Sequence, residues 1–198
     1  MVSYDERTAL IVVDVQNDFA DPAGSLAVRG GDEIVPRVND AIQSALAAGA
    51  TVVYTQDWHP DSTPHFAKDG GIWPVHCVAG TWGAALFPAL EVAPGALRVH
   101  TGTGGEDGYS GFTVRDPLSG VETPTELDSL LRARAIERTV ICGLATDYCV
   151  RATVLDALRL GYATTVLGDG IAAVDLQEGD GERALGEMVE AGAILSES

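Results

Sequence analysis

The chain has 198 residues, of which 46% are hydrophobic and 21% are charged, as is usual for a globular protein with one substantial core. The 29 acidic residues outnumber the 12 basic ones, so the formal charge of −17 disfavours binding to nucleic acid or to an anionic membrane surface. The length predicts one domain over residues 1–198. The odd number of cysteines predicts no disulfide framework, and the lack of any long apolar run predicts no membrane span, so we expect the protein in the cytoplasm.

Short apolar runs alternate along the chain with segments of helical periodicity. The expected strands are residues 9–13, 51–55, 97–101, 139–142, 163–167 and 193–195, and the expected helices are residues 32–48, 125–135, 147–160 and 181–191. Apolar strands that alternate with helices favour parallel pairing, with both faces of the sheet covered. The sequence therefore predicts a three-layer α/β/α domain around a mostly parallel six-stranded sheet. Two irregular stretches, residues 56–96 and 102–124, are long enough to build a site.

A carboxylate follows the first expected strand. Asp14 comes directly after the apolar run 9–13, at the edge of the sheet where parallel α/β domains place their sites. Burial of a carboxylate there is costly unless it has a partner or a task. Asp14 is therefore a candidate general base, and a turn or capping aspartate is the alternative interpretation.

A cluster of potential metal ligands follows the second strand. Asp57 and His59 are two residues apart, so on a strand they point to the same side. His65 and His76 come next, which places three of the four histidines within 18 residues. Imidazole and carboxylate groups suit Zn, Fe or Mn, although solvated loop histidines are the alternative. Cys77 is expected to be a buried thiol rather than a ligand.

Two further motifs do not support a site. Residues 102–108 are glycine-rich but do not match a dinucleotide-binding fingerprint, so a flexible loop is the simpler interpretation. Ser110 lies in a Gly-Tyr-Ser-Gly run that is one residue shorter than the turn of serine hydrolases. We therefore do not expect a serine nucleophile.

Cys149 lies where the apolar run 139–142 gives way to helical periodicity. In the first turn of a helix, free backbone N–H groups and the macrodipole lower the pKa of a thiol and can hold an oxyanion. Cys149 is therefore the candidate nucleophile, and a small buried hydrophobe is the alternative. Cys142, inside an expected strand, is assigned to the core.

Five ordered motifs resemble those of nicotinamidases, within the isochorismatase-like cysteine hydrolases. The motifs are residues 14–19, 57–60 with 65–66, 73–78, 109–112 and 143–150. The resemblance implies hydrolysis of nicotinamide, and of analogues such as pyrazinamide, to nicotinate and ammonia through a cysteine thioester, a reaction of NAD salvage. It also implies a homodimer. An isochorismatase-type vinyl-ether hydrolase, which needs neither a thiol nor a metal, is the alternative enzyme.

The resemblance also implies a role for each motif residue. Cys149 would be the nucleophile, Asp14 its base, and the backbone N–H groups of Ala145 and Cys149 the oxyanion hole, with a cis peptide bond before Ala145. The expected ligands of one divalent ion, zinc before iron or manganese, are Asp57, His59, His65 and His76. The expected walls of a pyridine pocket are Phe19, Leu26, Trp73, Tyr109 and Tyr148.

The sequence departs from the family at one catalytic position. Thr101 stands where the family has a lysine, and the only lysine of the chain is Lys68. Without a cation, Asp14 and a thiolate at Cys149 would repel each other, which raises the pKa of the cysteine. His100 is no substitute, because neighbouring strand residues face opposite sides. The departure leaves two alternatives, an amide hydrolase with impaired turnover and an inactive homologue that binds nicotinamide and a metal.

Overall fold

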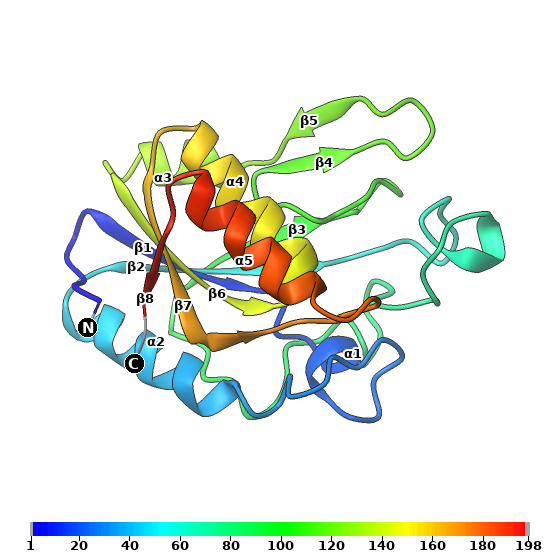
Figure 1. Cartoon of the computed structure of the whole chain (residues 1–198), viewed down its shortest axis with the longest axis horizontal. Coiled ribbons are helices and arrows are strands. Elements are labelled where there is room, and N and C mark those ends of the chain that lie inside the picture. Colours follow the sequence, from blue (N-terminus) through cyan, green and yellow to red (C-terminus); the bar gives the residue numbers. More distant parts are fainter. Residues whose placement is uncertain (1, 197–198) are drawn as a thin grey trace.

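The structure, a computed structural model, describes residues 2–196, in which six strands form one parallel sheet (Figure 1). The order across the sheet is β3-β2-β1-β6-β7-β8. The strands of this sheet are β1 (Thr8–Val13), β2 (Thr51–Asp57), β3 (Leu97–Thr101), β6 (Arg138–Leu144), β7 (Ala163–Ala172) and β8 (Ile194–Ser196). Because the chain builds outward from β1 and then from β6, the strand order reverses between these two central strands. The prediction of a parallel six-stranded sheet is confirmed.

Helices cover both faces of the sheet. Helix α2 (Val35–Ala47) packs on one face, where Val38 and Ile42 contact the core that includes Leu10 and Tyr54. The other face carries α3 (Leu127–Arg132), α4 (Arg151–Arg159) and α5 (Asp180–Glu190), whose apolar side chains join the second core. The expected three-layer architecture is thus present, because the strands are apolar on both sides.

The strands and helices differ from the prediction mainly at their ends. Strands β2, β6 and β7 run past the apolar runs that predicted them, to Asp57, Leu144 and Ala172. The expected helix 147–160 begins as a π-helical turn, η2 (Thr146–Val150), before α4. The irregular stretches contain short elements that periodicity does not reveal: η1 (Ala67–Asp69) and the antiparallel hairpin β4 (Thr113–Arg115) and β5 (Glu122–Pro124). A further short helix that was not predicted, α1 (Asn17–Ala20), follows β1.

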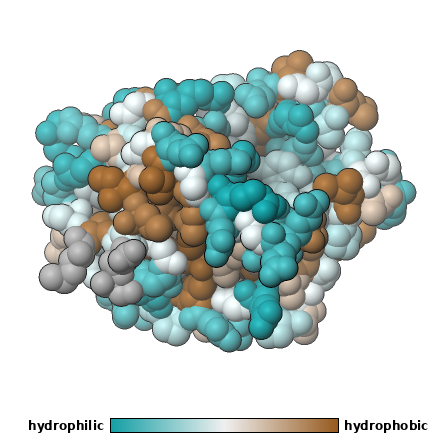
Figure 2. All heavy atoms as spheres, in the orientation of Figure 1, coloured by the Kyte–Doolittle hydropathy of each residue, from teal (hydrophilic) through white to brown (hydrophobic). Residues whose placement is uncertain are grey.

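The surface is mixed. Figure 2 shows hydrophilic side chains over α5 and apolar ones gathered over β7 and β8, at the edge of the sheet, where Ile194 is 66% exposed. None of the helices in residues 2–196 is long and apolar enough to cross a membrane. The cytoplasmic location and the homodimer stay predictions.

Candidate active site

Asp14 and Cys149 meet at the point where the strand order reverses. Asp14 follows β1 and is buried, and its backbone turns away from the strand with φ of 48°. Cys149 is the fourth residue of η2, which follows the neighbouring strand β6, and its thiol lies close enough to the Asp14 carboxylate for each group to shift the pKa of the other. The thiol and the carboxylate are therefore brought together by two adjacent strand ends, as expected for a parallel sheet.

Thr55 fixes the orientation of Asp14. The Thr55 hydroxyl donates a hydrogen bond of 2.6 Å to Asp14 Oδ1, and the Asp14 N–H is directed at Thr55. Burial and the nearby charge of Asp57 raise the pKa of Asp14 to about 7, although the hydrogen bonds from Thr55 and Cys149 favour the ionised form. Asp14 thus titrates near neutral pH, as a general base requires.

The Cys149 thiol is not activated in the way the sequence suggested. Burial and the charges of Asp14 and Asp57 raise the pKa of Cys149 well above its usual value, and only the backbone hydrogen bond from Ala145 lowers it. The position after β6 therefore does not by itself set this pKa, because burial, followed by the charges of Asp14 and Asp57, acts in the opposite direction. The role expected for the missing lysine stays a prediction.

The turn between β6 and η2 has an unusual backbone. The Leu144–Ala145 peptide bond is cis, as the resemblance implied, and Ala145 lies in the pocket wall. Gly143 has φ of 113°, and a Cβ there would lie 2.1 Å from the carbonyl oxygen of Val13. Only glycine therefore allows β6 to approach β1 this closely beside the site.

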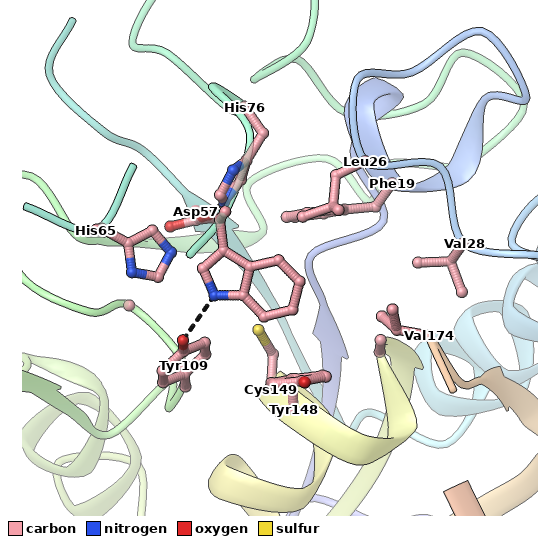
Figure 3. Close-up of a pocket in the computed structure, with 13 residues that line it drawn as sticks. Phe19, Leu26, Val28, Asp57, His65, His76, Tyr109, Tyr148, Cys149 and Val174 are labelled. Carbon is pink, nitrogen blue, oxygen red and sulfur yellow. Dashed lines mark hydrogen bonds and ion pairs between the residues drawn. The ribbon is translucent and has the colours of Figure 1, made fainter. Parts of the chain in front are cut away.

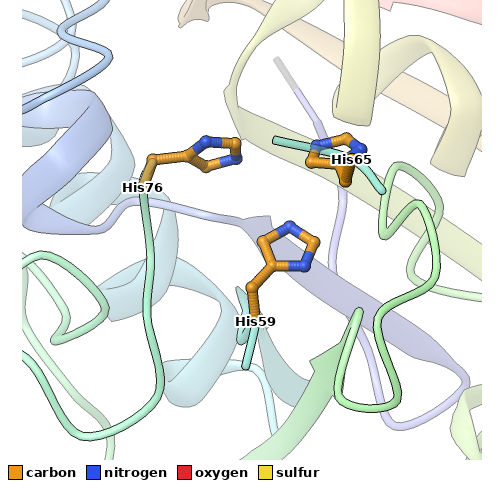
Figure 4. Close-up of side chains that lie close together, drawn as sticks. All are labelled: His59, His65 and His76. Carbon is orange, nitrogen blue, oxygen red and sulfur yellow. The ribbon is translucent and has the colours of Figure 1, made fainter. Parts of the chain in front are cut away.

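Three imidazole rings face a common space next to this pair (Figure 4). Each of His59, His65 and His76 offers a ring nitrogen, and these atoms all lie within 4.8 Å of one another. The carboxylate of Asp57 joins them, with Oδ1 2.8 Å from His59 Nε2 and Oδ2 3.1 Å from His76 Nε2. Asp57 is held by Gln16, which donates to the Asp57 carbonyl and accepts the Asp57 N–H.

The polar atoms of this cluster fit a metal ion. Asp57 Oδ1 and His59 Nε2 lie 2.8 Å apart without hydrogen-bond geometry, and the buried His59 Nδ1 has no hydrogen-bond partner. Such groups are costly unless something else satisfies them. His65 and His76 direct Nδ1 to Asp107 Oδ1 and to the Pro74 carbonyl, at 2.7 Å each, which leaves Nε2 of each ring available. Three imidazoles and one carboxylate form a ligand set suited to zinc.

The glycine-rich run 102–108 packs against this cluster. A Cβ at Gly102 would lie 2.6 Å from the His59 ring, and one at Gly108 would lie 2.8 Å from Asp57 Oδ1. The run therefore packs against the site and does not project away from it. Its glycines let the backbone approach the metal-ligand candidates, and periodicity carries no signal for such packing.

Thr101 supplies no charge to the site. It is buried at the end of β3, beside Asp57 in the sheet register, and its hydroxyl is 3.5 Å from the Gln56 carbonyl. Within residues 2–196, no lysine or arginine lines the pocket, and Lys68 pairs with Asp69. His100 is exposed and stacks on Trp58, on the other side of the strand, as predicted.

An aromatic pocket lies over the thiol (Figure 3). All five predicted wall residues line it, together with two valines that were not predicted: Phe19, Leu26, Trp73, Tyr109 and Tyr148, with Val28 and Val174. The Trp73 indole N–H donates to the Tyr109 hydroxyl at 2.8 Å. Figure 3 shows the Cys149 sulfur pointing into this space, with His65 and His76 on the opposite wall.

Other candidates have structural roles. Cys77 and Cys142 are buried, and burial raises the pKa of Cys142 to about 12. The Ser110 hydroxyl donates to Asp156 at 2.7 Å, outside the pocket wall. Sequence reasoning missed Thr55 and Asp107. The spacing of Thr55 from Asp57 on one strand was an available signal, whereas nothing in the sequence separates Asp107 from its neighbour Glu106.

The fold and the carboxylate–thiol pair at its centre define the class of the protein: a cysteine hydrolase domain with three-layer α/β/α architecture. The Isochorismatase domain model matches residues 8–198, so the chain belongs to the isochorismatase family. It is 40% identical to a nicotinamidase of Escherichia coli K12, over 94% of this chain and 93% of that protein.

Solved structures agree with this assignment. The pyrazinamidase of Pyrococcus horikoshii in complex with zinc superposes with a TM-score of 0.86 at 39% identity, covering 97% of this chain and 99% of that one. A yeast nicotinamidase bound to the inhibitor nicotinaldehyde superposes with a TM-score of 0.87 at 29% identity, covering 96% and 100%. The likeness extends over nearly the whole of each chain.

Proposed function

We propose that the protein is a nicotinamidase, which hydrolyses the carboxamide of nicotinamide, and of pyrazinamide, to the acid and ammonia. The observation that carries this proposal is the interacting Asp14–Cys149 pair under an aromatic pocket, with a metal-ligand cluster on the opposite wall. A flat pyridine ring suits walls made by Phe19, Trp73 and Tyr148, and its carboxamide would reach the thiol. The named activities of the relatives support this choice of substrate.

The chemistry proceeds in two halves. The Cys149 sulfur attacks the amide carbon while its proton moves to Asp14, and the resulting oxyanion accepts hydrogen bonds from the N–H groups of Ala145 and Cys149. Asp14 returns the proton to the nitrogen as the C–N bond breaks, which releases ammonia and leaves a thioester. Asp14 then takes a proton from water, the water oxygen attacks the thioester, and the C–S bond breaks to release the acid while Asp14 returns the proton to the sulfur to restore the thiol.

We infer that Asp57, His59, His65 and His76 hold one divalent transition metal ion, zinc in preference to iron or manganese. The unsatisfied polar atoms of Asp57 and His59 support this inference. When bound, the ion supplies a Lewis acid that can anchor the pyridine nitrogen and polarise the ring. The protein's own part is to keep the carboxamide over Cys149 once the ring is anchored.

The absence of the family's lysine favours a second candidate, a homologue that binds metal and nicotinamide without turnover. Two carboxylates lie near the thiol, and no lysine or arginine of the described residues lines the pocket wall to offset them. A vinyl-ether hydrolase is less well supported, since that chemistry would leave the thiol and the histidine cluster without a task.

Ammonia release from nicotinamide tests the proposal. Purified protein whose mass confirms Thr101 should release ammonia and nicotinate at a rate above that of Cys149→Ala, which retains the pocket but lacks the sulfur. Equal rates for the two proteins, together with saturable nicotinamide binding, would favour the binding homologue. Equal rates without binding would exclude both candidates.

A further inference from the structure

A chain of polar contacts leads from the surface to the histidine cluster. The Arg115 guanidinium donates from Nη2 to Asp107 Oδ2 at 3.0 Å, and Asp107 Oδ1 lies 2.7 Å from His65 Nδ1. Asp107 and His65 are only 6% and 5% exposed, whereas the Arg115 side chain is 53% exposed. A carboxylate oxygen only accepts hydrogen bonds, so the proton of this contact belongs to His65 Nδ1.

The backbone holds Asp107 in place. Its N–H donates to the Arg115 carbonyl at 2.7 Å, and the Arg115 N–H donates back at 3.1 Å, which joins the residue to the end of β4. Gly108, the next residue, packs against Asp57 and Thr101. The Asp107 carboxylate is therefore fixed by the hairpin on one side and by the metal-ligand cluster on the other.

We infer that Asp107 is a positioning residue of the metal site, whose carboxylate holds His65 in the Nδ1–H tautomer and so presents its Nε2 lone pair to the ion. The inference rests on the metal site proposed above and assigns a function to a residue outside its ligand set. A carboxylate behind a ligating imidazole fixes the ring and makes it a stronger donor. Arg115 in turn orients the carboxylate from the surface side.

The comparison with His76 shows what is special about this contact. The Nδ1 of His76 meets the neutral carbonyl of Pro74, whereas that of His65 meets a buried carboxylate. Both contacts select the same tautomer, but a negative charge behind the ring increases the basicity of the ligand atom more than a carbonyl dipole does. His65 therefore depends on a side chain that can be exchanged, and His76 on a backbone group that cannot.

Metal affinity tests this inference. Apo-protein competes with a chromophoric chelator for Zn²⁺, and Asp107→Asn, which keeps the shape but loses the charge, should bind Zn²⁺ about 10- to 100-fold more weakly. Glu106→Gln is the matched control, because it removes the neighbouring carboxylate, which contacts the Gly104 N–H and not His65. This control should stay within about twofold of the wild type, because Glu106 is only half-buried and contacts none of the metal-ligand candidates.

The possible outcomes separate the two proposals. Unchanged Zn²⁺ affinity in Asp107→Asn would overturn the role of Asp107 while the metal site stands. An equal loss in Glu106→Gln would show a general charge effect and would also overturn it. Failure of the wild type to bind Zn²⁺ would refute the metal site, and the inference would fall with it.

A spectroscopic measurement on the wild type tests the tautomer without relying on the fold of a variant. Long-range ¹H–¹⁵N spectra of the Zn²⁺-loaded protein should show His65 protonated at Nδ1 and without a proton at Nε2. The His65 signals are assigned by their loss in His65→Gln. A proton on Nε2, or protonation of both nitrogens, would contradict the inference, because neither form offers Nε2 to a metal.

Discussion

The Thr55 hydroxyl donates a 2.6 Å hydrogen bond to Asp14 Oδ1, across 41 positions of sequence. Both residues are buried; Thr55 lies on β2, and Asp14 directly follows the adjacent strand β1. A hydrogen bond donated to a carboxylate favours its ionised form, so Thr55 keeps the pKa of Asp14 from rising further. The pKa and the orientation of the proposed base therefore depend on Thr55, a neighbour that takes no part in the proposed proton transfers.

Replacement of Thr55 should shift the pH dependence of hydrolysis. With the pKa of Asp14 raised to about 7, kcat/KM should fall as the pH drops through that value, because a protonated Asp14 cannot take the thiol proton. Thr55→Ala removes the donor and should move this acidic limb upward by up to about one pH unit. Thr55→Ser keeps a hydroxyl and should restore the wild-type limb. A limb that is identical in all three proteins would exclude Asp14 as the titrating base.

Thr101→Lys should raise amide hydrolysis. An ammonium near Cys149 favours the thiolate, and one pKa unit corresponds to about 1.4 kcal/mol, or about tenfold in thiolate population. Better positioning of the reacting groups adds to this, so we expect a gain on the order of a hundredfold in nicotinate formation. Metal content should stay unchanged.

Thr101→Met controls for the added length without the charge, and Cys149→Ala sets the background. Equal rates for the wild type and Thr101→Lys, well above Cys149→Ala, would show that the chain does not need the lysine. Equal rates at background would favour the binding homologue. A gain in Thr101→Met as large as in Thr101→Lys would assign the effect to packing and not to charge.

The purified protein should contain about one transition-metal ion per chain, measured by elemental analysis. His59→Ala should lose most of it, because the remaining ligands hold a divalent ion more weakly. His100→Ala is the matched control, since His100 is the one histidine outside the cluster and stacks on Trp58. Full retention of the metal in His59→Ala would place the ion elsewhere.

Nicotinaldehyde should react with Cys149 and not with Cys77 or Cys142. Cys149 lines the pocket, whereas Cys77 and Cys142 are buried outside its wall, so access to the aldehyde separates the three thiols. With ¹³C in the aldehyde group, the carbonyl signal should convert to that of a thiohemiacetal in the wild type and in Cys142→Ala. The conversion should be absent in Cys149→Ala. Its persistence there would contradict the assignment of the nucleophile.

The sequence by itself determined the class of fold and most of the site residues. Strands that are apolar on both faces and helices between them leave few arrangements other than a covered parallel sheet. Asp14, Asp57 and Cys149 follow or end such strands, so their place at one edge of the sheet was predictable from local pattern. The parallel pairing of the strands and the cluster of His59, His65 and His76 agree with this prediction of a site at one edge of the sheet.

Only the tertiary structure decided how these residues behave. The helix terminus predicts a lowered pKa for Cys149, but burial of the thiol and, after it, the charges of Asp14 and Asp57 raise it. Glu106 and Asp107 are neighbouring acidic residues that the local pattern does not distinguish, and only the fold buries Asp107 against His65. Hydrogen bonds and charge interactions act over a few ångströms between residues far apart in the chain, so local periodicity cannot report them.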